Sequence, residues 1–267
     1  MSAAVGSAIR ALLRLLILLL LSALALQLYF VGRVALMAVV DPQSTTFERS
    51  EAWRLLTEKH QIPWQHQWVD YSQISAHLKR AVIASEDAGF TDHSGVEWDA
   101  IEKAWERNQR AEARVERLQE QLERRAQRLP PGKALPPRPP VRPEPKLVGG
   151  STITQQLAKN LFLGGERSLA RKAQEFVITL ALESLLSKQR ILEIYLNHVE
   201  WGEGVFGAEA AARHYFRTSA QGLGALPAAQ LAVMLPAPKR FEKRPSSAYV
   251  LGRASTIVAR MGAVEVP

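Results

Sequence analysis

Residues 149–160 are the part of this chain whose side-chain types and spacing are best suited to chemistry. A glycine pair leads to Ser151 and Thr152, and either hydroxyl can cap the helix that the following apolar positions predict. Glycines let the backbone approach a ligand closely, and the N–H groups at a helix start favour an anion. Lys159 lies one helical turn after Gln155, on the same face. The segment predicts an anion site for a phosphorylated, sugar-bearing substrate, although an ordinary capped amphipathic helix has the same pattern.

The predicted helix has two faces. The buried positions are Leu157, Ala158, Leu161 and Phe162, and the positions left for the other face are Gln155, Gln156, Lys159 and Asn160.

Two glutamates are the candidate groups for moving protons. Glu86 ends an apolar helix and precedes Asp87, and paired acids with partial burial raise a carboxyl pKa. Glu175 lies four residues after Arg171, which is also the spacing of a surface ion pair worth about 0.3–0.5 kcal/mol. Sugar transfer needs such carboxylates because its transition state is oxocarbenium-like.

The N-terminal segment predicts a membrane anchor. Residues 11–40 are almost wholly apolar and exceed the ~20 residues that a span needs. Arg10 and Arg14 lie at the start and Asp41 follows the end, so residues 1–10 should be cytoplasmic and residues 41–267 outside the cytoplasm. A signal peptide cleaved near Ala25 is the rival interpretation. With the glutamates and the anion-binding helix, the anchor suggests a lipid-linked sugar as substrate.

Composition narrows the function further. The chain has 267 residues, no cysteine and a net charge of +8, which excludes disulfides and cysteine-based metal sites. Residues 102–146 hold twelve Lys/Arg and seven Glu, a net +5 away from the candidate site. No basic residues interleave with aromatics as a nucleic-acid module requires. We therefore expect no nucleic-acid partner.

Helical periodicity dominates the remainder and predicts a mostly α fold. The expected helices cover residues 77–85, 96–105, 170–187, 188–197, 226–235 and 249–261. The charged residues 103–128 predict a solvated helix or a helical hairpin arm. Residues 130–145 hold eight of the fifteen prolines, which predicts an extended linker. Residues 103–146 are therefore interpreted as an insertion. The G-x-G-x-x-G at residues 202–207 follows a helix, so it predicts a glycine-rich turn and not a dinucleotide site.

Five blocks, in order, resemble the motifs of the peptidoglycan glycosyltransferases. Residues 86–95 resemble E-D-x-x-F-x-x-H-x-G, and residues 149–160 resemble G-G-S-T-I-T-Q-Q-L-x-K-N. Residues 171–175, 188–197 and 210–216 resemble R-K-x-x-E, K-x-x-I-L-E-x-Y-L-N and A-A-A-x-x-Y-F. The chain is thus similar to glycosyltransferase family fifty-one in its short, single-function form, and no transpeptidase domain is expected after residue 267.

The resemblance implies a lysozyme-like lobe, a small membrane-proximal lobe and an N-terminal transmembrane helix. It implies inverting polymerisation of lipid II into β-1,4-linked glycan strands, with release of undecaprenyl pyrophosphate. The expected location is the bacterial inner membrane, single-pass, with the catalytic domain in the periplasm. Expected partners are lipid II, the nascent strand, membrane lipid and other cell-wall synthesis or division proteins. No cofactor is required by the motifs, and Mg²⁺ or Mn²⁺ at the pyrophosphate is left open.

The resemblance also assigns residues. Glu86 matches the general base and Glu175 the second, donor-side glutamate. The matched pyrophosphate and cleft residues are Lys159, Arg167, Arg171, Thr152, Gln156 and Asn160, and the structural motif positions are Asp87, Phe90, His93 and Glu193. Two other functions share some of these features: a lysozyme-like hydrolase, which needs no cationic pyrophosphate site, and a silent scaffold, which needs no glutamates. The insertion departs from the family's short segment between its first two motifs.

Overall fold

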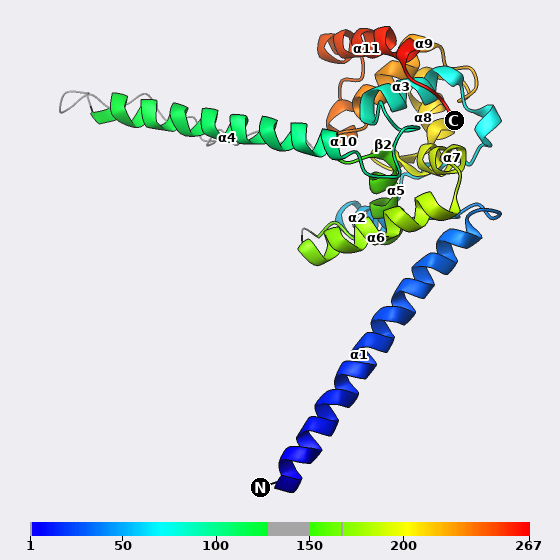
Figure 1. Cartoon of the computed structure of the whole chain (residues 1–267). Coiled ribbons are helices and arrows are strands. Elements are labelled where there is room, and N and C mark those ends of the chain that lie inside the picture. Colours follow the sequence, from blue (N-terminus) through cyan, green and yellow to red (C-terminus); the bar gives the residue numbers. More distant parts are fainter. Residues whose placement is uncertain (1, 128–149, 167) are drawn as a thin grey trace. The chain divides into compact units, whose positions relative to one another are not determined.

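The computed structural model describes residues 2–127, 150–166 and 168–267 (Figure 1). The described chain is mostly α-helical with three short strands, which confirms the predicted fold class. The helices are α1 (Ser2–Leu36), α2 (Thr46–Lys59), α3 (Ala76–Glu86), α4 (Trp98–Gln127), α5 (Ile153–Phe162), α6 (Leu169–Leu185), α7 (Lys188–His198), α8 (Ala208–Phe216), α9 (Ala225–Met234), α10 (Pro238–Phe241) and α11 (Ala248–Arg260). Short 3₁₀ turns η1 (Tyr71–Gln73) and η2 (Met261–Ala263) complete them.

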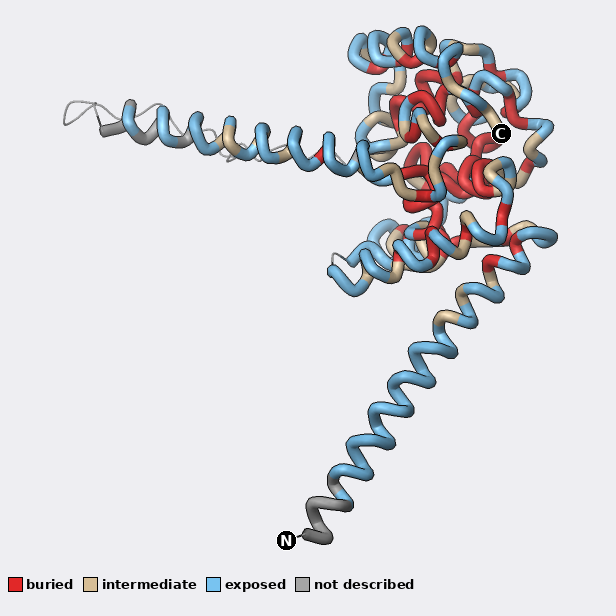
Figure 2. The backbone as a smooth tube through the Cα atoms, viewed as in Figure 1, coloured by how far each residue is buried: buried red, intermediate tan, exposed pale blue. Residues whose placement is uncertain are grey.

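The chain divides into two compact units. The larger comprises residues 1–95 and 152–267, and the smaller comprises residues 96–151. In the larger unit α3 packs mainly on α9 and α11, while α5 packs on α2, α6 and α7. Figure 2 shows the buried positions gathered in these helices and almost none along most of α1. α5 is therefore the helix around which the other elements of one half of the core are arranged.

Serine and threonine caps set most helix starts. Thr45 caps α2 and Thr152 caps α5, each in a reciprocal capping box with the residue three positions on. Ser168, Ser187 and Ser247 accept a backbone N–H at the starts of α6, α7 and α11. These are local features, which explains why five predicted helices agree with α3, α6, α7, α9 and α11 to within two residues. The helix predicted at 96–105 ends well before α4 does, and α2, α8 and α10 were not predicted.

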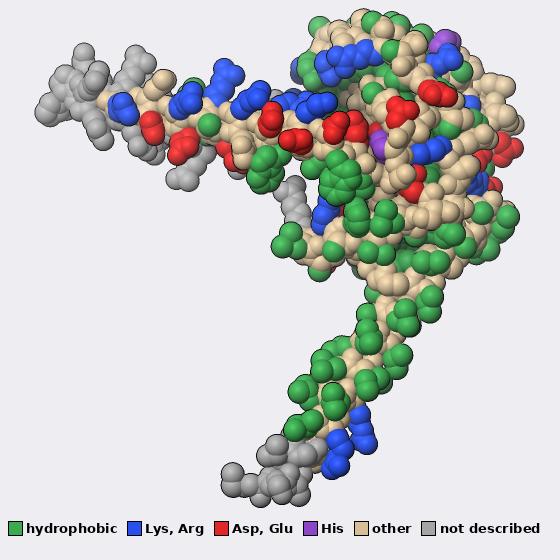
Figure 3. All heavy atoms as spheres, in the orientation of Figure 1, with side chains coloured by type: hydrophobic (Ala, Val, Ile, Leu, Met, Phe, Trp, Pro, Cys, Tyr) green, Lys and Arg blue, Asp and Glu red, His purple; other side chains and the backbone are tan. Residues whose placement is uncertain are grey.

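Helix α1 is long and apolar enough to cross a membrane. Its span, Ile9–Leu36, has a mean hydropathy of 2.4, and its side chains are exposed over most of its length (Figure 3). The helix ends at Leu36, so the apolar residues up to Val40, expected within the anchor, form turns instead. At its C-terminal end Val34 and Met37 enter the core, and Gln27 exchanges hydrogen bonds with Gln174 of α6 at 2.8 and 3.0 Å. The C-terminal end of α1 is thus packed on α6 and on the core of the larger unit.

The smaller unit contains one helix, α4, within its described residues. It joins the predicted 96–105 helix and the charged stretch into one helix of 30 residues. Ion pairs one turn apart, such as Glu106–Arg110 at 3.0 Å, lie on its exposed surface. The proline-rich segment predicted as a linker lies outside the described residues, whereas residues 103–127 of the insertion are described and belong to α4.

Three short strands form one sheet in the described chain, in the order β1 (Gln65–His66), β3 (Val205–Phe206), β2 (Glu200–Gly202). β1 is parallel to β3, and β2 is antiparallel to it. Within the glycine-rich residues 202–207, Gly202 ends β2, Glu203 and Gly204 form the turn, and Val205 and Phe206 form β3, so the segment is a turn between short strands and not the start of a βαβ unit. At Gly204, φ is +73° and an added Cβ would lie 1.8 Å from the Pro63 carbonyl oxygen, so only glycine fits.

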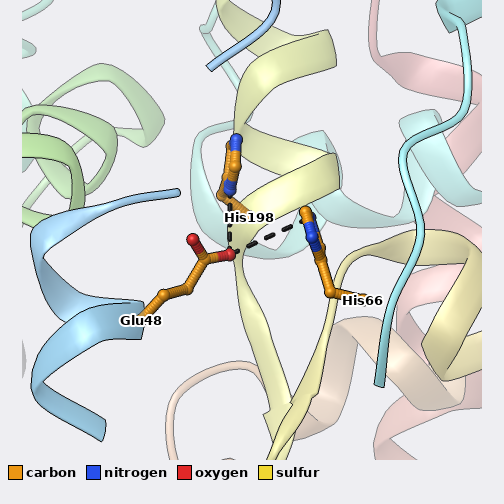
Figure 4. A group of neighbouring side chains, drawn as sticks. All are labelled: Glu48, His66 and His198. Carbon is orange, nitrogen blue, oxygen red and sulfur yellow. Dashed lines mark hydrogen bonds and ion pairs between the residues drawn. The ribbon is translucent and has the colours of Figure 1, made fainter. Parts of the chain in front are cut away.

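A buried Glu48–His66–His198 cluster holds the segment that follows the anchor (Figure 4). His198 Nδ1 lies 2.9 Å from Glu48 Oε1, and its Nε2 lies 3.0 Å from the Pro42 carbonyl oxygen. Both partners of His198 are acceptors, so each contact needs a hydrogen and the pair is interpreted as an ion pair. Glu48 Oε2 also accepts the N–H of Thr45, at 2.6 Å. The cluster thus joins the post-anchor segment to α2 and α7.

The same side chains have the spacing of a metal site, with ligand atoms within 4.8 Å of one another. However, His66 Nε2 must donate to the Asn197 carbonyl oxygen at 3.0 Å, and both His198 nitrogens are engaged. Hydrogen bonds therefore account for the arrangement, and we interpret the cluster as structural.

We expect Glu48→Gln to destabilise the larger unit by about 3–5 kcal/mol, because it removes one partner of a buried ion pair. Despite the cost of burial, the hydrogen bond and charge of His198 hold the pKa of Glu48 below its ordinary value. The stability it contributes is therefore complete above the unfolded pKa and is lost as the pH falls through the lower folded pKa. Thermal unfolding in detergent across pH measures both effects.

Glu58→Gln is the matched control. Its carboxylate pairs with Arg54 at 2.7 Å but is 60% exposed, so its loss should cost less than about 1 kcal/mol. Equal losses for the two variants would contradict the role of the cluster.

Candidate active site

The C-terminal end of α3 places Glu86 and Asp87 in different environments. Glu86 is partly buried, and Asp87, the residue after the helix, is 4% exposed. Asp87 Oδ1 accepts from His93 Nε2 at 2.8 Å, and Oδ2 accepts the N–H of Ile153 at 3.0 Å. Since Gly95 N–H donates to His93 Nδ1 at 3.1 Å, the histidine is the neutral Nε2–H tautomer. Asp87 therefore ties the end of α3 to the first residue of α5.

Thr152, and not Ser151, is the cap of α5. Its Oγ1 accepts the Gln155 N–H at 3.2 Å and donates to the Gly95 carbonyl oxygen at 2.7 Å. Gln155 completes the capping box and is buried, so its expected place on the exposed face was wrong. Thr152 is itself 3% exposed, with its hydroxyl engaged in the protein. The structure thus gives Thr152 a supporting position under the helix start.

Gln156 connects α5 to Glu86. Its Nε2 donates to Glu86 Oε2 at 3.0 Å, and its Oε1 accepts from the hydroxyl of Tyr195 at 2.9 Å. Tyr195 lies on α7 and is fully buried. Three helices therefore meet at this carboxylate.

Burial is the largest influence on Glu86 and raises its pKa. Hydrogen bonds from Gln156 and Ser85 lower the pKa, and the charge of Asp87 raises it. The net direction is upward, as the paired acids predicted. A carboxylate with a raised pKa is a stronger base while it is still ionised near neutral pH.

The second glutamate lies in a cationic environment at the start of α6. Glu175 Oε2 accepts from Arg171 Nη1 at 2.7 Å, and Oε1 accepts from Lys172 Nζ. Glu175 is only 3% exposed, so the surface-pair interpretation was wrong about its setting although the Arg171 pairing was right. Nε of Arg171 is buried and has no hydrogen-bond partner among the described residues.

Lys159 lies one turn of α5 after Gln156, toward Glu175. The side chain is exposed, yet nearby protein desolvates its ammonium group and lowers its pKa, while Glu175 raises it and Arg171 and Lys172 lower it. Asn160, the next residue, is partly exposed. The exposed face of α5 thus runs from one candidate glutamate toward the other. Arg167, a predicted pyrophosphate ligand, lies outside the described residues.

Two other predicted positions are structural in the described contacts. Phe90 is fully buried, with the Lys188 ammonium 4.6 Å from its ring centre. Glu193 accepts the N–H of Tyr71 at 2.6 Å and pairs with Arg190 at 2.7 Å. These contacts stabilise the packing of the larger unit, and none of them involves Glu86.

Sequence reasoning missed two residues of this site. Tyr195 sits within the apolar stripe of α7, which hides a hydroxyl among core positions. Lys172 is the second position of the R-K-x-x-E block, and no role was assigned to it from the sequence.

A divalent cation would need oxygen ligands. Both oxygens of Glu175 already accept from cationic side chains, which makes this carboxylate a poor metal ligand in this arrangement. The option of Mg²⁺ or Mn²⁺ at the pyrophosphate stays a prediction.

Known proteins of the same kind match nearly the whole chain. The family model described as Transglycosylase matches residues 54–122 and 141–262. The chain is 51% identical to a biosynthetic peptidoglycan transglycosylase of Burkholderia thailandensis, over 91% of this chain and 83% of that protein. It is 48% identical to a protein of the same name from Paraburkholderia phytofirmans, over 91% and 88%. The chain therefore belongs to the transglycosylase family and is a glycosyltransferase.

Proposed function

We propose that this glycosyltransferase polymerises lipid II into β-1,4-linked glycan strands and releases undecaprenyl pyrophosphate. The observation that carries the proposal is one helix face, on α5, that contacts a carboxylate at one end and approaches a cation-lined glutamate at the other. A proton acceptor beside an anion site is what transfer from a sugar pyrophosphate to a hydroxyl requires. The relatives' printed name, biosynthetic peptidoglycan transglycosylase, supports the same substrate class.

In this proposal Glu86 is the general base. It takes the proton of the acceptor's 4-hydroxyl while that oxygen attacks the anomeric carbon of the donor and the bond to pyrophosphate breaks, with inversion. Its raised pKa favours the proton transfer, and the Gln156 N–H keeps the carboxylate ionised and aimed.

The donor pyrophosphate lies on the cationic side. Lys159 is the exposed ammonium there, and no ion pair engages it within the described chain. Arg171 is held by Glu175, which fixes a guanidinium beside the leaving group. Arg167 and Asn160 are proposed ligands by resemblance. Positive charge stabilises the pyrophosphate as it departs.

The membrane delivers the substrate. We propose that α1 crosses the inner membrane once, with residues 1–10 in the cytoplasm and the catalytic unit in the periplasm, because Arg10 and Arg14 lie on the short side. Next to the anchor, α6 exposes an apolar stripe of Leu169, Phe176, Val177 and Leu180. We propose that these apolar side chains are buried against the acyl chains of the membrane lipids. A lipid-linked donor would then reach the site without leaving the bilayer surface.

Glu86→Gln should reduce polymerisation by at least ~100-fold, because it keeps the shape but removes the basic oxygen. Gel analysis of strands made from lipid II by detergent-solubilised protein measures the rate. Lipid II binding and helical circular dichroism should stay close to those of the wild type. Near-normal turnover would contradict the assignment of Glu86.

Lys159→Ala should raise the KM for lipid II by about tenfold or more, since a hydrogen bond to a charged group contributes ~1.5–3 kcal/mol. Inhibition by undecaprenyl pyrophosphate should weaken in parallel. Lys243→Ala is the control, because Lys243 is an exposed lysine of the α10–α11 connection and carries no role in this proposal. Equal behaviour of the two variants would place the pyrophosphate elsewhere.

Replacing residues 111–145 with a short Gly/Ser linker should preserve folding and basic polymerisation. The insertion is proposed to touch anionic lipid head groups, at ~1 kcal/mol per basic residue near the surface, or another wall-synthesis protein. Vesicle binding and the proteins recovered from cells should change, while strand synthesis should not. A variant that melts normally but makes no polymer would show that the insertion belongs to the catalytic machinery.

A further inference from the structure

The polar contacts of Glu86 extend one residue beyond the proposed machinery. Gln156 can contact the carboxylate with either end of its amide, but only Nε2 donates a hydrogen bond. With Oε1 turned to the carboxylate, two acceptors would face each other. The function of the base therefore depends on which way this amide points.

Tyr195 favours the direction in which Nε2 of this amide faces Glu86. Its hydroxyl donates to Gln156 Oε1 at 2.9 Å, on the side of the amide opposite Glu86. The ring is 0% exposed in α7, so the phenol is fixed in place by the core. Burial raises the pKa of Tyr195 well above its ordinary value, with the charge of Glu86 contributing, so the hydroxyl keeps its proton at working pH.

We propose that Tyr195 is a positioning residue for glycosyl transfer: its hydroxyl orients the Gln156 amide so that Nε2 faces Glu86. This inference rests on the proposed role of Glu86 as the base. Without the hydroxyl, Gln156 Oε1 loses this buried donor, and the orientation that turns Nε2 to the carboxylate is less favoured. Tyr195 touches neither substrate nor the reacting atoms, so it acts only through Gln156.

The other charged groups near Glu86 act independently of this contact. Asp87 raises the pKa of Glu86 and is itself engaged by His93 and Ile153. Helix α9, packed on α3, contains no ionisable side chain. The ionisable side chains of α11, which also packs on α3, make no hydrogen bond or ion pair with Glu86: Tyr249, Arg253 and Arg260. Removing the Tyr195 hydroxyl should therefore affect Glu86 through the hydrogen bond from Gln156 Nε2.

The predicted consequence has a definite sign. A donated N–H favours the ionised carboxylate, so its loss raises the pKa of Glu86. A general base works when ionised, so the acidic limb of kcat/KM against pH moves to higher pH. Tyr195→Phe should move this limb up by about one unit, which is about a tenfold lower rate at a fixed pH on the limb. At pH values above the acidic limbs of both profiles, the wild type and Tyr195→Phe should have the same kcat/KM.

Two further variants test the route of the effect. Gln156→Leu deletes the donor itself and should move the limb in the same direction. Tyr195→Phe combined with Gln156→Leu should move it no further than Gln156→Leu alone, because the phenol then has no amide to orient. Tyr215→Phe is the control: its hydroxyl donates to the Trp201 carbonyl oxygen at 2.8 Å, away from Glu86, and its limb should match the wild type.

The measurement is strand synthesis from lipid II by the full chain in detergent, across the pH range in which each variant keeps its helical circular dichroism. A Tyr195→Phe profile identical to the wild type, or one lowered equally at every pH, overturns the inference. Additive shifts in the double variant also overturn it. Glu86→Gln distinguishes a failure of the proposed base from a failure of the proposed role of Tyr195. Appreciable turnover by Glu86→Gln contradicts Glu86 as the base. An inactive Glu86→Gln together with an unshifted pH profile for Tyr195→Phe contradicts only the role of Tyr195.

Discussion

The buried carboxylate of Asp87 is the constraint on which the site depends. One oxygen receives His93 Nε2 and the other receives the first backbone N–H of α5, at 2.8 and 3.0 Å. A buried carboxylate is costly unless both oxygens are hydrogen-bonded, so this arrangement admits few alternatives. It fixes the end of α3 against the start of α5, and Glu86 and Gln156 meet across 70 positions of sequence because of it.

The same anchoring explains how the chain accommodates a long insertion. Residues 96–151 form a separate compact unit, but the residues on either side of it, Gly95 and Thr152, share a hydrogen bond of 2.7 Å. The chain therefore leaves and re-enters the larger unit at adjacent points. An inserted segment then costs mainly loop-closure entropy, which grows slowly with length.

Electrostatics differ at the two ends of the exposed α5 face. At one end burial raises the pKa of Glu86. At the other end desolvation lowers the pKa of Lys159, while Arg171 and Lys172 surround Glu175. The exposed face of α5 thus lies between a carboxylate of α3, which Gln156 contacts, and a cationic region of α6. The chain belongs to the transglycosylase family.

The sequence by itself determined the mostly α fold, the apolar anchor, the helix caps and the motif residues, because these depend on contacts within a few positions of the chain. Glu86 and Lys159 stood out by residue type and spacing, and Arg171 was assigned through the resemblance to the family. Only the tertiary structure decided that Glu175 is buried, that Gln155 serves the cap, and that Tyr195 reaches Gln156 from α7. Burial and long-range hydrogen bonds arise when distant helices pack, and helical periodicity carries no information about which partner a polar side chain will meet.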